Sequence, residues 1–287
     1  MIKKYINLDL EQEKKVKDLI YECECYDQSI LPIQFDHSLN YFSHMNSWFL
    51  FFEKEELIAT LSIFNPITSI AEISGCIKPN KRQQRKFNEL IKTSLIELRA
   101  YNIKTVLFVI DNDSKSGMSI IEKLNLKNHH TEYLMKYESI EKNNPTAINI
   151  REYNTSDLND LIRINSELFI ETYEESKNIL LACIKATDKK LYVAEINNIT
   201  IGMCTLFYNK NKVKIYGVGI CKKYQSKGYG YDLMNLILDS LKNQNFEIEL
   251  EVDSTNKTAY NLYKKIGFKE TRSVHYFEKE LVSVLSD

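Results

Sequence analysis

Hydrophobic and polar residues follow the same order of patterns twice along this chain of 287 residues. In each half, a short strand pattern and a helix pattern precede three strand patterns, after which strand and helix patterns alternate. A shift of about 143 residues places Leu57–Phe64 on Thr200–Phe207, and Asp111 matches Asp253. We therefore expect two domains of one architecture, each near the usual domain length.

The expected elements of the first half are strands at 4–8, 47–53, 56–64, 69–77, 104–110 and 132–138, and helices at 9–26, 83–101 and 114–124. Those of the second half are strands at 148–152, 190–196, 199–208, 212–220, 246–252 and up to 281, and helices at 156–170, 174–186, 229–243 and 256–266. A three-strand meander followed by alternating strands and helices predicts an α/β (α+β) fold. Each domain is expected to be a mixed, mostly antiparallel twisted sheet with helices on both faces.

The segment between the two halves is polar, contains Pro145 and has no hydrophobic period. We interpret residues 141–147 as a linker between domains at 1–140 and 148–287.

Composition narrows the function. A formal net charge of −1 with interspersed Lys and Glu offers no electrostatic case for nucleic acid or an anionic membrane as partner. No apolar run is long enough to span a bilayer and the start lacks a secretion signal, so we expect a cytoplasmic protein. The six scattered cysteines have no zinc-ligand spacing, and we expect reduced, mostly buried thiols and no metal.

One stretch has the pattern of a phosphate-binding turn. Gln225, Ser226, Lys227, Gly228, Tyr229 and Gly230 follow an apolar strand pattern and open a helix pattern. Closely spaced glycines at a helix start leave backbone N–H groups free to hold a phosphate. The same short pattern also occurs in ordinary loops.

The first half supplies an internal control for this turn. Gln225, Gly228 and Gly230 fall on Arg82, Arg85 and Phe87, and six of the eight glycines of the chain lie in the second half. We therefore expect a backbone cradle for phosphate in the second half only.

A strand and the helix after it carry candidate catalytic groups. The strand 246–252 alternates Glu with apolar residues, which places its carboxylates on one face. In the following helix, Asn256, Ala259, Tyr260 and Tyr263 share one face. A tyrosine that faces a carboxylate across a cleft is a candidate acid–base pair.

The turn and the run Asn256-x-x-Ala259-x-x-Leu262-Tyr263-x-x-Ile266-Gly267-Phe268, in this order, resemble the GNAT superfamily of acetyl-CoA-dependent N-acetyltransferases. The resemblance covers residues 148–281 well and the first half in architecture only. A decayed first copy before a working second copy is similar to the layout of mycothiol synthase. Leu250 to Tyr263 is also similar to the ribosomal-protein alanine N-acetyltransferases.

The resemblance implies roles for individual residues. Backbone groups of Val218, Gly219 and Ile220 would pair with the pantetheine arm, the N–H groups of 225–230 would hold the pyrophosphate, and Asn256 would contact the coenzyme. Tyr263 would protonate the departing thiolate and Glu251 would act as base. Tyr263 as a core aromatic, and Glu251 as a solvated carboxylate with Glu249 in its place, stay open as alternatives.

The first half lacks these groups. With the shift above, Glu251 falls on Phe108, Glu249 on Val106, and Tyr263 on Ile120 or Ile121.

The expected function is acetyl-CoA-dependent transfer of an acetyl group to a primary amine, by direct attack in a ternary complex in the second domain. The alternative is a catalytically silent sensor or scaffold that binds an acyl-CoA. The acceptor is a small-molecule or peptide amine, and five acidic residues favour a cationic one: Glu171, Glu174, Glu175, Glu249 and Glu251. Monomer and homodimer both stay open.

Overall fold

A computed structural model describes residues 1–138, 147–242 and 244–281. The expected linker at 141–147 lies outside the described residues except for Ala147. The chain divides into two compact units, which we name unit 1 (Met1–Thr131 with Val274–Asp287) and unit 2 (Glu132–Ser273).

These units differ from the boundaries expected from the sequence, because each half supplies its last strand to the other unit. The end of β12 (Phe268–Glu280) pairs antiparallel with β5 (Thr105–Asp111), and the end of β6 (Lys127–Tyr137) pairs antiparallel with β11 (Glu247–Asp253). Hydrophobic patterning identifies strands without identifying their partners. The exchange was therefore not visible in the sequence.

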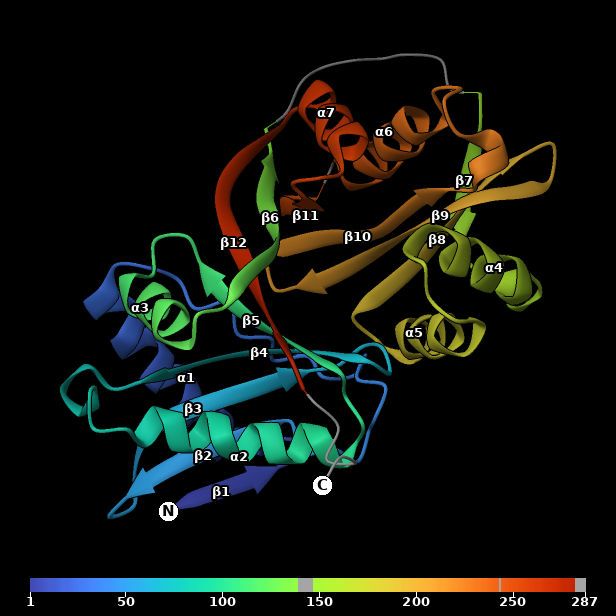
Figure 1. The fold of residues 1–287 in the computed structure, drawn as a ribbon. Coiled ribbons are helices and arrows are strands. Elements are labelled where there is room, and N and C mark those ends of the chain that lie inside the picture. The colour runs from blue at the N-terminus through green and yellow to red at the C-terminus, as the bar shows by residue number, and fades with distance from the viewer. Residues whose placement is uncertain (139–146, 243, 282–287) are drawn as a thin grey trace. The chain divides into compact units, whose positions relative to one another are not determined.

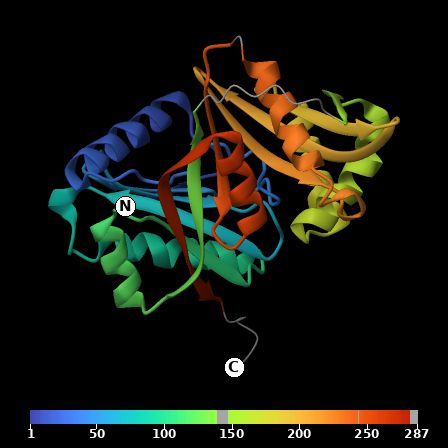
Figure 2. The same cartoon turned by 90° about the horizontal axis from the view of Figure 1, so that it is seen from above.

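Unit 1 contains a sheet in the order β1-β2-β3-β4-β5-β12. Its strands before β5 are β1 (Ile2–Tyr5), β2 (Trp48–Glu53), β3 (Glu56–Phe64) and β4 (Ile70–Ile77). Its helices are α1 (Leu10–Asp27), α2 (Lys86–Ala100) and α3 (Lys115–Leu124). Figure 2 shows α1 on one face of this sheet and α2 and α3 on the other.

Two hydrophobic clusters hold these layers of unit 1 together. Val16 and Leu19 of α1 pack with Trp48, whereas Leu90 of α2 and Ile121 of α3 belong to a larger cluster on the other face. The strand β5 is apolar throughout its centre because both its faces are covered.

Unit 2 repeats this arrangement, with strand order β12-β6-β11-β10-β9-β8-β7. Its other strands are β7 (Asn149–Glu152), β8 (Lys189–Ile196), β9 (Ile199–Asn209) and β10 (Lys212–Ile220). Its helices are α4 (Leu158–Phe169), α5 (Tyr173–Lys185), α6 (Tyr229–Leu241) and α7 (Lys257–Ile266). In Figure 1, α6 and α7 lie on one face of these strands and α4 and α5 on the other.

The predicted fold class is confirmed. Each unit is a mixed, mostly antiparallel sheet with helices on both faces, and in the described part of the chain its parallel pair is β4–β5 in unit 1 or β10–β11 in unit 2. All six cysteines are free thiols; Cys25 is exposed, although the sequence favoured buried positions. Within the described residues, no helix is both long and apolar enough to cross a membrane.

Candidate functional site

The segment Gln225–Gly230 forms the turn between β10 and α6. The Nε2 of Gln225 donates a hydrogen bond of 2.8 Å to the carbonyl oxygen of Ile220, which ties the turn to the end of β10. Ser226 and Gly228 have left-handed backbone conformations, with φ values of 62° and 88°. The first N–H groups of α6 have no carbonyl partner within the helix, which is the arrangement that an anion-binding turn requires.

Gly228 leaves open space at the start of α6, because among the described residues a Cβ there would meet no atom within 4 Å. A Cβ at Gly230 would contact Leu262 of α7 at 3.5 Å. A side chain at Gly228 would fill the space through which a phosphate approaches the backbone. The residues present therefore fit a coenzyme that carries a diphosphate.

Next to the turn, the parallel strands β10 and β11 separate. Their recorded pairing runs from Lys212 with Glu247 to Ile215 with Leu250, and β10 then bulges between Tyr216 and Gly219. Beyond this point, residues 216–220 have a strand partner only in β9 among the described residues. Their other edge offers backbone groups to an extended ligand. Val218, Gly219 and Ile220, expected to contact the coenzyme, lie on this edge.

The alternation predicted for β11 is confirmed. Ile248, Leu250 and Val252 belong to one buried cluster with α6 and α7, so the three glutamates lie on the opposite face of the strand. The glutamates form ion pairs with lysines on this face. The distances between lysine Nζ and glutamate Oε are 2.6 Å (Lys136–Glu247), 3.0 Å (Lys212–Glu247), 3.4 Å (Lys212–Glu249) and 2.7 Å (Lys214–Glu251).

Glu251, the expected base, lies beside Lys214 of β10. The side chain of Glu251 is 41% exposed and that of Lys214 is 30% exposed. Burial lowers the pKa of Lys214, but Glu251, together with Glu132 and Glu249, more than offsets this effect and the pKa is raised. The pair therefore consists of a charged ammonium hydrogen-bonded to the carboxylate.

Tyr263, the expected acid, is buried on α7. Its side chain packs with the ring of Phe268, the centroids being 5.9 Å apart, and burial raises the pKa of its hydroxyl. Tyr263 belongs to the cluster on the α6–α7 face of β11, whereas Glu251 lies on the other face. The expectation that the two side chains face each other across a cleft is therefore wrong. They approach the sheet from opposite sides.

Asn256 has a structural role at the start of α7. Its side-chain oxygen accepts a hydrogen bond of 3.1 Å from the backbone N–H of Ala259 and caps the helix. The contact of Asn256 with a coenzyme stays a prediction.

The acidic residues near α5 are occupied within the protein. Glu171 accepts hydrogen bonds from Asn165 at 2.7 Å and from Ser176 at 3.0 Å, and burial raises its pKa. Glu175 belongs to the capping box of α5, and Glu174 forms an exposed ion pair. Because the two β11 glutamates are paired with lysines as well, the argument for a cationic acceptor loses its support.

The structure also corrects the alignment of the two halves. The parallel partners begin at Ile70 and Thr105 in unit 1 and at Lys212 and Glu247 in unit 2, so both strands are offset by 142 residues. The β10 bulge adds one residue, so the offset is 143 at the turn. Using 143 for β11 as well placed that strand one residue out of step with β5.

With this offset, Glu251 aligns with Val109, Glu249 with Leu107 and Tyr263 with Ile121. The prediction that unit 1 has neither a carboxylate nor a hydroxyl at these positions holds.

The turn of unit 1 keeps the backbone conformation of its counterpart without the glycines. Gln83 and Arg85 both have φ values of 62°, matching Ser226 and Gly228, and the Nε of Arg82 donates to the carbonyl oxygen of Ile77 at 3.4 Å. Side chains, rather than the backbone, distinguish the two turns.

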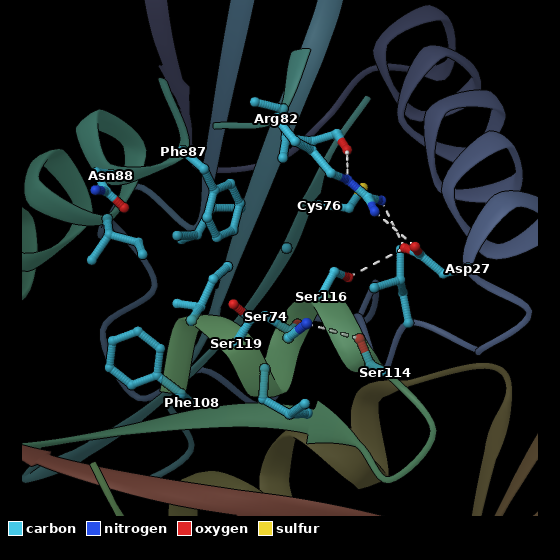
Figure 3. A pocket seen from close by; sticks show the side chains of 18 of the residues that line it. Asp27, Ser74, Cys76, Arg82, Phe87, Asn88, Phe108, Ser114, Ser116 and Ser119 are labelled. Carbon is cyan, nitrogen blue, oxygen red and sulfur yellow. Dashed lines mark hydrogen bonds and ion pairs between the residues drawn. The ribbon is translucent and has the colours of Figure 1, made fainter. Parts of the chain in front are cut away.

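A cavity of about 1080 Å³ lies next to this turn, between β4, β5 and α3 of unit 1 (Figure 3). Asp27 accepts two hydrogen bonds of 2.7 Å from the guanidinium of Arg82 and one of 3.3 Å from Ser116. Phe87, at the position of Gly230, lines the cavity.

Residues 158–268 match the model of the acetyltransferase (GNAT) family. This segment lies in unit 2 and is similar to that family. The protein is therefore an acyltransferase, and the family generally uses acetyl-CoA. The match spans β10, the turn, β11 and α7, which hold the site residues described above.

The chain is similar to an N-alpha-acetyltransferase of Sulfurisphaera tokodaii, with 26% identity over 143 residues, covering 45% of this chain and 84% of that protein. Its fold is similar to that of a GCN5-related N-acetyltransferase from Sphaerobacter thermophilus, with a TM-score of 0.72, 16% identity and coverage of 98% and 95% of the two chains. A tandem GNAT protein of the clavulanic acid biosynthesis pathway has a TM-score of 0.69, 8% identity and coverage of 100% and 99%. The duplicated GNAT fold thus extends over both units.

Sequence reasoning missed the lysine partners of the β11 glutamates and the cavity of unit 1. Lys212 and Lys214 alternate along β10 as the glutamates do along β11, and this spacing indicates the lysine partners. Using it requires knowing that β10 pairs in parallel with β11, which a strand pattern does not give.

Proposed function

We propose that unit 2 binds acetyl-CoA and transfers its acetyl group to a primary amine by direct attack in a ternary complex. The observation that carries this proposal is the separation of β10 from β11 beside the open turn of Gly228 and Gly230. A free strand edge and an anion-binding helix start next to each other suit a ligand with an amide chain and a diphosphate.

In this proposal, the N–H groups of residues 226–230 hold the diphosphate, whereas that of Gln225 donates to the carbonyl oxygen of Lys222 at 3.2 Å. The edge of Val218–Ile220 pairs with the pantetheine arm. Asn256 contacts the arm while it caps α7. Bound acetyl-CoA supplies an acetyl group activated as a thioester. The protein's part is to position this group at the opening between the two strands.

Glu251 is the proposed base on one side of that opening. An amine is mostly protonated near pH 7 and attacks only after it loses a proton. The carboxylate of Glu251 takes this proton directly or through a water molecule. Lys214, 2.7 Å away, holds the carboxylate in place and balances its charge.

Tyr263 is the proposed acid on the other side. Because burial raises the pKa of its hydroxyl, Tyr263 keeps its proton at neutral pH until a strongly basic thiolate develops beside it. The proton that leaves the amine and the proton that reaches the thiolate then travel on opposite faces of the sheet. This division accounts for the positions of both residues.

The first acceptors to test are peptides with a free N-terminus, because a relative that aligns with 45% of this chain is named an N-alpha-acetyltransferase. Peptides blocked at the N-terminus but carrying lysine are the matched control. Simple amines, amino acids and aminoglycosides complete the panel.

The test follows the free thiol released from acetyl-CoA together with the mass of the acceptor. We expect acceptor-dependent thiol release and a gain of one acetyl group, both lowered in Glu251→Gln and nearly unchanged in Glu247→Gln. Saturable acetyl-CoA binding without transfer to any amine of the panel would favour the silent sensor instead.

A further inference from the structure

The cavity of unit 1 occupies the place that the proposed coenzyme cleft occupies in unit 2. It lies where β4 and β5 separate, since their recorded parallel pairing ends at Ile73 with Phe108, and the following turn and α3 close it (Figure 3). At about 1080 Å³ it is at the upper end of the size of small-molecule pockets, roughly 300–1000 Å³.

The side chains of this cavity oppose a diphosphate at the turn. Gly230 has no side chain in unit 2, and in unit 1 Phe87 stands at that position, lines the cavity and contacts the core cluster. Of the cations near the turn, Arg82 pairs with Asp27, and Lys81 and Lys86 pair with Glu53. An aromatic ring and these paired cations thus stand beside a turn whose backbone resembles that of unit 2.

The remaining cavity suits an uncharged chain that carries amides. Ser74, Gly75 and Cys76 lie on the edge of β4 beyond its recorded pairing with β5, and alternate backbone groups of such an edge pair with an extended amide chain. Ser119 of α3 adds a hydroxyl from the opposite wall, and the side chain of Phe108 adds apolar surface.

We propose that unit 1 binds an extended, amide-bearing chain without a diphosphate, and that Phe87 excludes the nucleotide part of coenzyme A. Pantetheine, the phosphate-free arm of the coenzyme, is the probe for this chemistry. Val109 and Ile121 stand where unit 2 has Glu251 and Tyr263, so the chain is bound and not acetylated there.

The first experiment titrates pantetheine into protein saturated with coenzyme A, by calorimetry. We expect one further equivalent to bind. Ser119→Trp, which fills the cavity from α3, should weaken this binding by about tenfold or more. Glu122→Trp, the same change on the exposed side of the same helix, should leave it unchanged.

Failure to bind pantetheine, or equal binding by both tryptophan variants, would overturn the proposal. The tryptophan pair is compared without coenzyme A as well. A loss in Ser119→Trp alone then supports the unit 1 site even if unit 2 binds no coenzyme, which separates this inference from the proposed function.

The second experiment removes the aromatic ring of Phe87. Because the turn already has the required φ values at Gln83 and Arg85, Phe87→Gly should raise the coenzyme A stoichiometry from one to two per chain. Arg85 and Lys123 lie at the edge of the cavity, and their positive charges favour the phosphates of coenzyme A. Coenzyme A is therefore the ligand that tests exclusion by Phe87 most strictly. Two equivalents on the unaltered protein would refute exclusion by Phe87, as would one equivalent on a folded Phe87→Gly variant.

Discussion

Units 1 and 2 share a turn but differ in what surrounds it. Arg85 adopts nearly the same conformation in unit 1 as Gly228 does in unit 2, although a left-handed conformation is costly for arginine. Loss of glycine from a motif therefore did not mean loss of its backbone shape. What differs is the side chain, since Phe87 stands in unit 1 at the position of Gly230 in unit 2.

The two sheets also differ in the side chains on one face. In unit 2, the face of β11 opposite α6 and α7 carries glutamates paired with lysines. In unit 1, Leu107 and Val109 at these positions pack with Tyr276 in a small apolar cluster. The comparison teaches that the two units share a scaffold, whereas this face of the sheet carries Glu–Lys pairs in unit 2 and an apolar cluster in unit 1.

The largest effect is expected from removing the proposed acid. Tyr263→Phe should lower the rate of acetyl transfer by about 100-fold and leave the coenzyme dissociation constant nearly unchanged. Tyr260→Phe, on the same helix with its hydroxyl 3.2 Å from Glu270, should retain full activity. Steady-state kinetics with calorimetry would check this, and a parallel fall in rate and affinity would place Tyr263 in the core alone.

Acid should destabilise unit 1 through its buried His37. Burial lowers the pKa of His37 to about 4, although Asp36 raises it. The unfolded chain, with a histidine pKa near 6.5, takes up the proton first, so stability falls as pH drops from about 6.5 to 4, by roughly 3 kcal/mol.

Urea unfolding followed by the fluorescence of Trp48 measures this change, since Trp48 is the single tryptophan and lies in unit 1. Its ring centroid is 5.2 Å from that of His37. His37→Gln should flatten the pH dependence over this range. An unchanged slope in that variant would assign the effect to other groups.

A smaller effect is expected from Lys214→Met. Removing the ammonium that holds the Glu251 carboxylate at 2.7 Å should lower the rate of acetyl transfer by roughly threefold to tenfold. Lys212→Met, which removes the pairs with Glu247 and Glu249, is the matched control. Equal rates for the two variants would argue against a positioning role for Lys214.

Much of the fold was predictable because periodicity reports which residues are buried. The strand 212–220 and the hairpin after 56–64 were located within one or two residues, since their apolar runs end at polar turns. The exchange of β6 and β12 was not predictable, because any apolar strand edge satisfies the same pattern.

The site was predictable where chemistry depends on local spacing. The turn 225–230 is a contiguous motif and opens a helix as expected. Asn256 was expected to contact the coenzyme, and its role as the cap of α7 was not predicted. The relation of Glu251 to Tyr263 was misjudged because it depends on which face of β11 packs against α7. The retained turn of unit 1 was missed because a left-handed Arg85 has no sequence signal.

The number of acetyl-CoA molecules bound per chain tests the division between the units most directly. Calorimetry should give one equivalent for the unaltered protein and none for Gly230→Phe, which places in unit 2 the ring that unit 1 carries. Asp239→Phe, at the exposed far end of α6, should still bind one. Two equivalents, or one that persists in Gly230→Phe, would contradict the account.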